Sequence, residues 1–153
     1  MHDVDAFHSG VEACDAYLKD QARKPRNRCL VMAENARILA YGRYACAEAG
    51  PEASLRPCIY IDFVARDTGA APGTGTDLMI NLLVRIARDP KAAMAKGVLI
   101  DVIDCGNPEA CTRRWRFFIE LMGFRPLHDD GRPCGYAFMS MEQVREIAAR
   151  AGA

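Results

Sequence analysis

One stretch of the chain constrains its fold more than any other: two apolar runs separated by a glycine-rich loop and an amphipathic segment. The first run, Cys58–Ala65, is rich in β-branched and aromatic residues, and the second is Gly97–Asp104. Residues 67–76 between them are small and turn-prone, and the apolar stripe of Asp77–Arg88 predicts a helix. The sequence therefore predicts a parallel strand pair joined by a right-handed helical crossover.

Helices and hairpins are predicted on both sides of this unit. Capping-box patterns at Ser9–Glu12 and Ser140–Gln143 indicate the starts of a first and a last helix, and Gly123 is placed to end another. The predicted elements are a helix over 9–22, a hairpin of 29–33 with 38–45, a helix over 108–122, a hairpin of 124–128 with 136–139, and a helix from 140 onward.

Length and charge limit the classes of protein that the chain can belong to. With 153 residues, 50% hydrophobic and 26% charged, it is predicted to be one globular domain over residues 1–153. Twenty basic residues balance twenty acidic ones, so no net field of the whole molecule attracts nucleic acid, although a local basic patch remains possible. The acidic N-terminus and the lack of a long apolar stretch predict a cytoplasmic protein without a membrane segment.

The seven cysteines are read from their spacing. They form no Cys-x-x-Cys pair and no repeated Cys/His spacing, so no metal site is predicted. Cys105 ends a predicted strand, where nucleophiles often occur, but no histidine lies nearby in sequence to activate it. A buried, unreactive thiol is the prediction for Cys105.

The chemistry of the chain concentrates in the loop Gly73-Thr74-Gly75-Thr76. At the junction of a strand and a helix, such a turn presents backbone N–H groups without intrahelical partners, and the helix dipole adds partial positive charge. Phosphate groups bind readily there, although a tight turn that simply needs glycine has the same pattern. A Walker A motif is excluded, because no Gly-Lys-Ser/Thr follows.

Three stretches and the element order together match a known superfamily. They are Phe63-Val64-Ala65 at the end of the central strand, Gly73–Leu78, and Phe118–Phe124, which reads FIELMGF. With them the chain resembles the GNAT superfamily of acyl-CoA-dependent N-acetyltransferases over nearly its whole length. The start, with Phe7, Gly10 and Asp15–Leu18, is similar to the FxxGxxxLDxYL pattern of the branch that includes toxin–antitoxin acetyltransferases.

This resemblance implies the fold and the binding site. It implies an α/β fold with a mixed, mostly antiparallel sheet, a splayed parallel strand pair and helices on both faces. Acetyl-CoA would be the acyl donor. Backbone amides of the strand segment would line its pantetheine and acetyl carbonyl, and the loop would bind its pyrophosphate. The residues so implied are Phe63, Val64, Ala65, Ala70, Ala71, Gly73, Thr74, Gly75 and Thr76.

The chain departs from the superfamily pattern at two positions. Ala70 stands where a glutamine or arginine usually contacts the phosphates, so one polar contact is missing. Ile119 stands where a tyrosine commonly serves as general acid toward the CoA thiolate, so that role is empty. Relatives without this tyrosine depend on the thiolate being a good leaving group.

Asp62 is the candidate general base. A carboxylate on the cleft face of the central strand can accept the proton of the attacking amine, directly or through a water. The alternative for Asp62 is an ion pair with a neighbouring arginine. Tyr60 shares its strand face and could shape the acceptor pocket or pack in the core.

The leading hypothesis is transfer of an acetyl group from acetyl-CoA to a primary amine of a small molecule or peptide, by direct attack in a ternary complex. A first alternative is a toxin that acetylates aminoacyl-tRNA and pairs with an antitoxin. The N-terminal resemblance favours it, and the zero net charge and Ile119 weigh against it. A second alternative is a catalytically weak domain that binds CoA or a partner. A homodimer stays open.

A set of basic residues could bind tRNA or the 3′-phosphate of CoA. These residues could form a patch, for which a solvated helix face is the alternative. The set is Arg23, Lys24, Arg26, Arg28, Arg113, Arg114 and Arg116.

Overall fold

The computed structural model describes residues 2–24, 29–47 and 53–152. The chain forms two compact units, each made from two segments of sequence. The first unit comprises Met1–Tyr44 and Asp62–Leu82, and the second comprises Ala45–Ile61 and Leu83–Ala153. A single domain over residues 1–153 stays a prediction.

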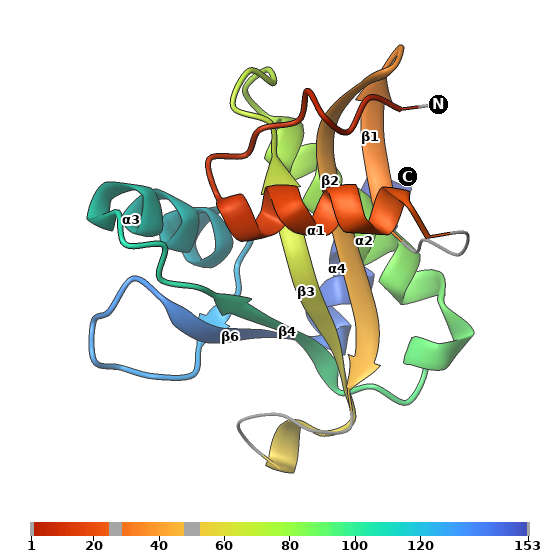
Figure 1. Cartoon of the computed structure of the whole chain (residues 1–153). Coiled ribbons are helices and arrows are strands. Elements are labelled where there is room, and N and C mark those ends of the chain that lie inside the picture. Colours follow the sequence, from red (N-terminus) through yellow and green to blue (C-terminus); the bar gives the residue numbers. More distant parts are fainter. Residues whose placement is uncertain (1, 25–28, 48–52, 153) are drawn as a thin grey trace. The chain divides into compact units, whose positions relative to one another are not determined.

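The helices and strands occur in the predicted order (Figure 1). They are α1 (Glu12–Ala22), β1 (Leu30–Glu34), β2 (Arg37–Ala47), η1 (Ala53–Leu55), β3 (Cys58–Arg66), α2 (Thr74–Arg88), η2 (Pro90–Ala92), β4 (Gly97–Val102), α3 (Pro108–Arg116), the π-helical turn η3 (Phe117–Leu121), β5 (Arg125–Pro126), β6 (Gly135–Ser140) and α4 (Met141–Ala151). The six strands have the order β1-β2-β3-β4-β6-β5. β3 and β4 are parallel, and the pairs β1–β2, β4–β6 and β5–β6 are antiparallel, which confirms the mixed sheet.

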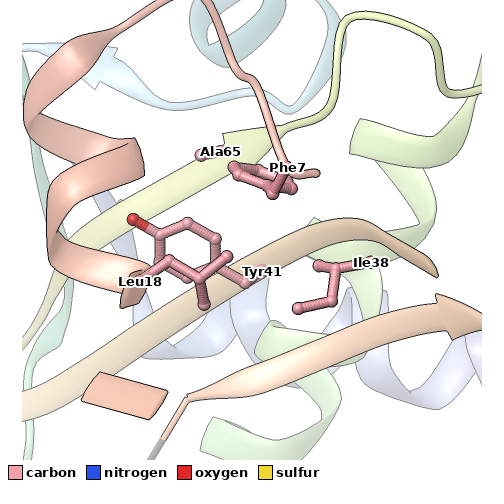
Figure 2. Packing of buried hydrophobic residues seen from close by; sticks show 5 residues of the cluster. All are labelled: Phe7, Leu18, Ile38, Tyr41 and Ala65. Carbon is pink, nitrogen blue, oxygen red and sulfur yellow. The ribbon is translucent and has the colours of Figure 1, made fainter. Parts of the chain in front are cut away.

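The core of the first unit forms around Tyr41 on β2. Five buried side chains make up this cluster, and Figure 2 shows them together: Phe7, Leu18, Ile38, Tyr41 and Ala65. The Phe7 ring meets the Tyr41 ring edge to face at 5.6 Å between centroids, and the Tyr41 hydroxyl donates to the Cys14 carbonyl at 2.6 Å. Burying each large apolar side chain contributes roughly 1.5–3 kcal/mol, so α1 is held to the hairpin mainly by Leu18 and Tyr41.

The first capping box does not form as predicted. The helix begins at Glu12 without a side-chain cap at Val11. The Ser9 hydroxyl donates to Asp15 at 2.6 Å, and the Ser9 N–H donates to the same carboxylate oxygen at 2.9 Å. Asp15 therefore accepts from the Ser9 N–H, as the pattern expected of Glu12, because the chain turns at Gly10 and brings Ser9 beside the first turn of α1.

Buried Asp67 joins three segments of the first unit at the start of the glycine loop. One carboxylate oxygen accepts from the His8 N–H at 2.9 Å. The other accepts from the Gly69 N–H at 3.0 Å and from the Arg37 guanidinium at 2.9 Å. Burial raises the pKa of Asp67, but hydrogen bonds from His8, Arg37 and Gly69 outweigh burial, so its pKa is lowered overall.

The second unit contains the parallel pairing and a long antiparallel pair. Residues 59–61 of β3 pair with 98–100 of β4, and β4 pairs with β6 from Gly97–Ser140 to Val102–Gly135. Gly97 is required here because a Cβ would lie 2.2 Å from the Met139 carbonyl oxygen. Ser140 caps α4 by accepting from the Gln143 N–H, which confirms the second capping prediction. The splay of β3 from β4 stays a prediction.

Several predicted boundaries change, among them those of α2, β4 and α3. α2 begins at Thr74 instead of Asp77, so the end of the glycine loop is already the first turn of the helix. β4 ends at Val102, two residues early. The helix predicted over 108–122 is α-helical only to Arg116 and continues as a π-helical turn, a feature that often accompanies functional sites.

Asp67→Asn is expected to lower the free energy of unfolding by about 2 kcal/mol at neutral pH, because it removes the charge from an acceptor of three hydrogen bonds. Since the pKa of Asp67 is lowered on folding, this stabilisation is present above the unfolded pKa of about 3.9 and is lost as the pH falls through the folded value. Urea unfolding at several pH values measures it. Asp5→Asn, at an exposed carboxylate, is the control, and an equal loss in both variants would contradict the prediction.

Candidate active site

All the residues predicted to bind acetyl-CoA, and Asp62, lie in the first unit. Phe63, Val64 and Ala65 continue β3 beyond Asp62. Asp67 holds the loop that follows this strand, and residues 74–76 form the first turn of α2. The strand segment, the loop and the helix N-terminus are therefore parts of one compact unit.

The loop presents backbone donors that its own side chains leave uncapped. The Thr74 hydroxyl donates to the Ala71 carbonyl at 2.7 Å instead of accepting from an amide, and the Thr74 N–H donates to the same oxygen. Within residues 53–152, the N–H groups of Gly73, Gly75 and Thr76 donate to no protein acceptor. These donors and the positive end of the α2 dipole can bind a phosphate.

Gly73 keeps the space above this turn open. Its φ is +90°, a conformation that residues with a side chain rarely adopt, and a Cβ at this position would meet nothing within 4 Å. Thr74 and Ala70 are buried, whereas Ala71 is exposed. The methyl group of Ala70 is therefore packed in the protein, and the turn presents backbone amides.

The strand segment uses its side chains for packing. Phe63 stacks on Tyr17 of α1, with ring centroids 3.7 Å apart and an interplanar angle of 8°. Ala65 belongs to the core cluster around Tyr41, and Val64 is half-buried. The side chains of Phe63 and Ala65 are therefore used in packing, and contacts of the backbone of this segment with a ligand stay a prediction.

Asp62 is paired through one oxygen only. Its Oδ2 lies 3.1 Å from Nη1 of Arg43 on β2, so the predicted alternative, an ion pair with a neighbouring arginine, is present. The same Arg43 nitrogen donates to the Tyr17 hydroxyl at 2.8 Å. Oδ1 of Asp62 is buried and has no hydrogen-bond partner in the described protein. That oxygen is therefore an unsatisfied acceptor within the described protein.

Burial changes the proton affinity of the Asp62 carboxylate. Burial raises the pKa of Asp62 above its ordinary value, and the nearby charge of Arg43 and the backbone N–H groups of Asp62 and Phe63 offset this only in part. The Asp62 side chain is 20% exposed, and the Arg43 side chain is 31% exposed. A carboxylate with a raised pKa accepts protons more readily than an ordinary aspartate does.

Sequence reasoning missed Tyr17 and Arg43. Tyr17 lies on α1 and Arg43 on β2, and both reach Asp62 or its neighbour Phe63. Arg43 follows Tyr41 by two residues, so strand alternation would have placed it on the α1 side together with Tyr41. That alternation was the signal available in the sequence.

Other predicted residues lie in the second unit. Tyr60 packs against the cluster of Cys58, Leu99 and Phe138, which favours its core interpretation. Ile119 is half-buried on the π-helical turn. The prediction of a buried thiol at Cys105 is wrong, because Cys105 is exposed.

The basic set is divided between the two units. Arg26 and Arg28 lie outside the described residues. Lys24 pairs with Asp20 at 2.7 Å, in the first unit. In the second unit, Arg114 donates to the Ile103 carbonyl and Arg116 lies 4.0 Å from Glu120.

The described residues contain neither a metal-binding cluster nor a membrane-spanning helix. Across 2–24, 29–47 and 53–152, no group of three or more His, Cys, Asp or Glu side chains could hold a metal ion. No helix in this part of the chain has the length and apolar character needed to cross a membrane.

The fold matches solved acetyltransferase toxins. A tyrosine-to-phenylalanine mutant of the AtaT toxin, bound to the C-terminus of the antitoxin AtaR and acetyl-CoA, has a TM-score of 0.74 at 19% identity over 97% of this chain and 92% of its own. A tyrosine-to-phenylalanine mutant of KacT has a TM-score of 0.72 at 19% identity, and the match covers 95% of this chain and 92% of KacT. AtaT complexed with acetyl-methionyl-tRNAfMet has 0.68 at 20% identity, covering 95% and 92%. The fold is that of the GNAT superfamily, as predicted.

Sequence similarity shows the family to which the chain belongs. No family model matches the chain. The chain is, however, 32% identical to a probable toxin TacT of Sinorhizobium fredii, over 82% of this chain and 80% of that protein. It belongs to the TacT family of toxins, within the toxin branch of the GNAT superfamily. The predicted enzyme class, a GNAT-type acyltransferase, is confirmed. These relatives fit the toxin alternative better than the leading hypothesis of a general amine acetyltransferase.

Gly75→Asp is expected to raise the Kd for acetyl-CoA at least about tenfold, or 1.4 kcal/mol, because it puts a negative charge beside the free amides of Gly73 and Thr76. Isothermal titration calorimetry measures the change. Gly75→Asn has nearly the same shape without the charge and is expected to bind more tightly than Gly75→Asp. Unchanged affinity in the charged variant would remove the loop from the binding site.

Proposed function

We propose that the chain is a toxin that transfers the acetyl group of acetyl-CoA to the α-amine of an amino acid carried by tRNA. The observation that carries this proposal is the 32% identity to a TacT toxin over 82% of the chain. A neighbour of the same fold, AtaT, has been solved with acetyl-methionyl-tRNAfMet, the expected product of such a reaction. The acceptor of the leading sequence-based hypothesis, a small-molecule or peptide amine, is the alternative that the experiment below distinguishes from charged tRNA.

The glycine loop would bind the pyrophosphate of acetyl-CoA. The N–H groups of Gly73, Gly75 and Thr76 point to no protein acceptor, and the open left-handed turn at Gly73 lets a diphosphate approach the backbone. Backbone amides of residues 63–65 would then contact the pantetheine and the acetyl carbonyl. The solved AtaT toxins with acetyl-CoA support acetyl-CoA as the donor.

Asp62 would act as the general base. The amine nitrogen attacks the thioester carbonyl and forms a C–N bond, and the C–S bond breaks as the tetrahedral intermediate collapses. The attacking nitrogen must lose a proton, which Oδ1 of Asp62 can accept, directly or through a water. Arg43 would hold the carboxylate in place through Oδ2, and Tyr17 would hold Arg43. In this proposal Arg43 and Tyr17 are positioning residues.

The acceptor requires local positive charge, because the chain has no net charge. Arg113 is exposed and next to Arg114, at the end of α3, and no ion pair of the described chain neutralises either of them. We assign phosphate contacts to these two residues. Each contact that neutralises a phosphate makes binding more sensitive to salt. The logarithm of the binding constant falls with the logarithm of the salt concentration, with a slope of about −0.7 per contact for single strands.

A toxin of this kind would have a protein partner. AtaT has been solved with its antitoxin AtaR, and we propose an antitoxin as the partner of this chain. A substrate of charged tRNA places the protein in the cytoplasm in this proposal. The homodimer stays a prediction.

Asp62→Asn is expected to lower kcat by about 10²–10⁴-fold and to leave the Kd for acetyl-CoA nearly unchanged, because it removes a proton acceptor and keeps the shape. In the native enzyme the base is ionised above its raised pKa, so kcat/KM should fall on the acid side at a higher pH than the usual aspartate value of about 3.9. The pH profile of initial rates measures both effects.

The control for this variant is Asp101→Asn on β4, whose half-buried carboxylate also has a pKa raised by burial. It is expected to keep the native rate and the acid limb of the profile. Native turnover in Asp62→Asn, or the same loss in both variants, would leave the base unassigned.

The acceptor is tested with radiolabelled acetyl-CoA and tRNAs charged with different amino acids. Label is expected on charged tRNA, to be released with the N-acetylated amino acid when the ester bond is hydrolysed, and none is expected on uncharged tRNA. Arg113→Gln and Arg114→Gln should weaken tRNA binding and reduce its salt dependence, with Arg116→Gln, next to Glu120, as the control.

Two results would contradict the proposed acceptor. Transfer to free amines with no preference for charged tRNA would restore the general amine acetyltransferase. Tight binding of acetyl-CoA without turnover on any amine or charged tRNA would favour the non-catalytic alternative.

A further inference from the structure

Two cysteines meet where β4 leads into α3. The Sγ atoms of Cys105 and Cys111 lie 3.2 Å apart, within the second unit. A disulfide has an S–S distance of about 2.05 Å, so the two sulfurs need to approach by only about 1 Å. Cys105 is exposed, and Cys111 is buried.

The backbone around the pair fixes this contact. Gly106 adopts a φ of +78° and donates its N–H to the Asp104 carboxylate at 2.9 Å, which turns the chain back after β4. Asn107 then caps α3 by accepting from the Ala110 N–H, and the Cys105 N–H donates to the Cys111 sulfur at 3.3 Å. Cys105 is therefore held against the first turn of α3 by the backbone on both sides of it.

The surroundings of the two sulfurs differ in the way that a reactive and a resolving thiol differ. Hydrogen bonding with the backbone of Asn107, then with Cys111, and the charge of Arg114 lower the pKa of Cys105. For Cys111, the Cys105 N–H favours the thiolate, but burial, Cys105 and Asp104 outweigh it and raise its pKa. Cys105 is thus the better nucleophile and the one that solvent reaches.

We propose that Cys105 and Cys111 form a reversible intrachain disulfide when the protein meets a peroxide. The inference is independent of the proposed transferase activity. It rests on the sulfur contact, the exposure of one partner and the turn that holds them together.

The chemistry balances in two steps. The Cys105 thiolate attacks one oxygen of hydrogen peroxide, and the O–O bond breaks. Cys105 becomes a sulfenic acid, and the hydroxide that leaves takes up the proton of the Cys105 thiol to form water. The Cys111 sulfur then attacks the sulfenic sulfur, the S–S bond forms and a second water leaves. Two thiols lose two electrons and two protons in total, and one peroxide is reduced to two waters. A small dithiol reverses the reaction.

Other cysteines provide the comparison. Cys46 is exposed like Cys105, but its sulfur contacts the Lys91 carbonyl and no sulfur contact is described for it. Cys58 is buried in the cluster with Leu99 and Phe138. Neither Cys46 nor Cys58 thus has the sulfur contact that Cys105 has with Cys111 at 3.2 Å.

The test follows a single tryptic peptide, Gly97–Arg113, which contains Cys105 and Cys111 and no other cysteine. Full-length, reduced protein is treated with hydrogen peroxide, alkylated, digested and analysed by mass spectrometry. We expect loss of both alkylation sites and a peptide lighter by two hydrogens, with full return of both sites after dithiothreitol. The peptide that contains Cys46 should keep its alkylation at the same peroxide dose.

Two variants separate the roles of the thiols. Cys111→Ser should leave Cys105 as a sulfenic acid that a dimedone probe labels, and Cys105→Ser should leave Cys111 reduced and slow to alkylate. Cys46→Ser is the control and should oxidise like the native protein. If native Gly97–Arg113 keeps both thiols while Cys46 is oxidised, or if Cys105 bonds to any cysteine other than Cys111, the proposal is overturned.

Discussion

The contact on which the candidate site depends most is the burial of one charged carboxylate, Asp67. Its two oxygens accept from the N-terminal arm at His8, from β2 at Arg37 and from the loop itself at Gly69. A buried charge is stable only when hydrogen bonds replace its hydration, so the three donors must be in place together. This requirement fixes where β3 ends, and it sets the direction in which the chain reaches Gly73 a few residues later. The free amides of the loop owe their arrangement to it.

Asp62 shows the opposite balance between burial and charge. One guanidinium satisfies one of its oxygens, and the second oxygen is buried without a partner. At Asp67 the hydrogen bonds outweigh burial and lower the pKa, whereas at Asp62 burial outweighs Arg43 and raises it. The hydrogen bonds to Asp67 stabilise its charged form and with it the fold. The surroundings of Asp62 favour its protonated form more than water does. Two aspartates five residues apart thus have different roles because they have different numbers of donors.

The sequence was sufficient for the parts of the fold that local patterns determine. The strands around Ile59 and Val98, the helix between them and the free amides near Gly73 follow from periodicity and from the need for glycine, so they could be predicted. An ion pair of Asp62 with an arginine was an expected alternative, and strand alternation could place Arg43 on the α1 side. That Arg43 is the partner and that Tyr17 contacts it could not be predicted, since these residues come from α1, β2 and β3. The capping of α1 failed for a similar reason, because Asp15 and Glu12 compete for Ser9 and tertiary packing decides between them.

The loss of the tyrosine at Ile119 matters less for the proposed reaction than the loss of the base would. A thiol has an ordinary pKa near 8.5, so a CoA thiolate can leave without a proton at neutral pH, and a general acid adds little. An α-amine has an ordinary pKa of about 7.7–8.0 and is mostly protonated at pH 7, and only its neutral form can attack a carbonyl carbon. The proposed reaction therefore needs an acceptor for the amine proton. In the proposed reaction the carboxylate of Asp62 would be that acceptor, while isoleucine at position 119 would leave the departing thiolate without a general acid.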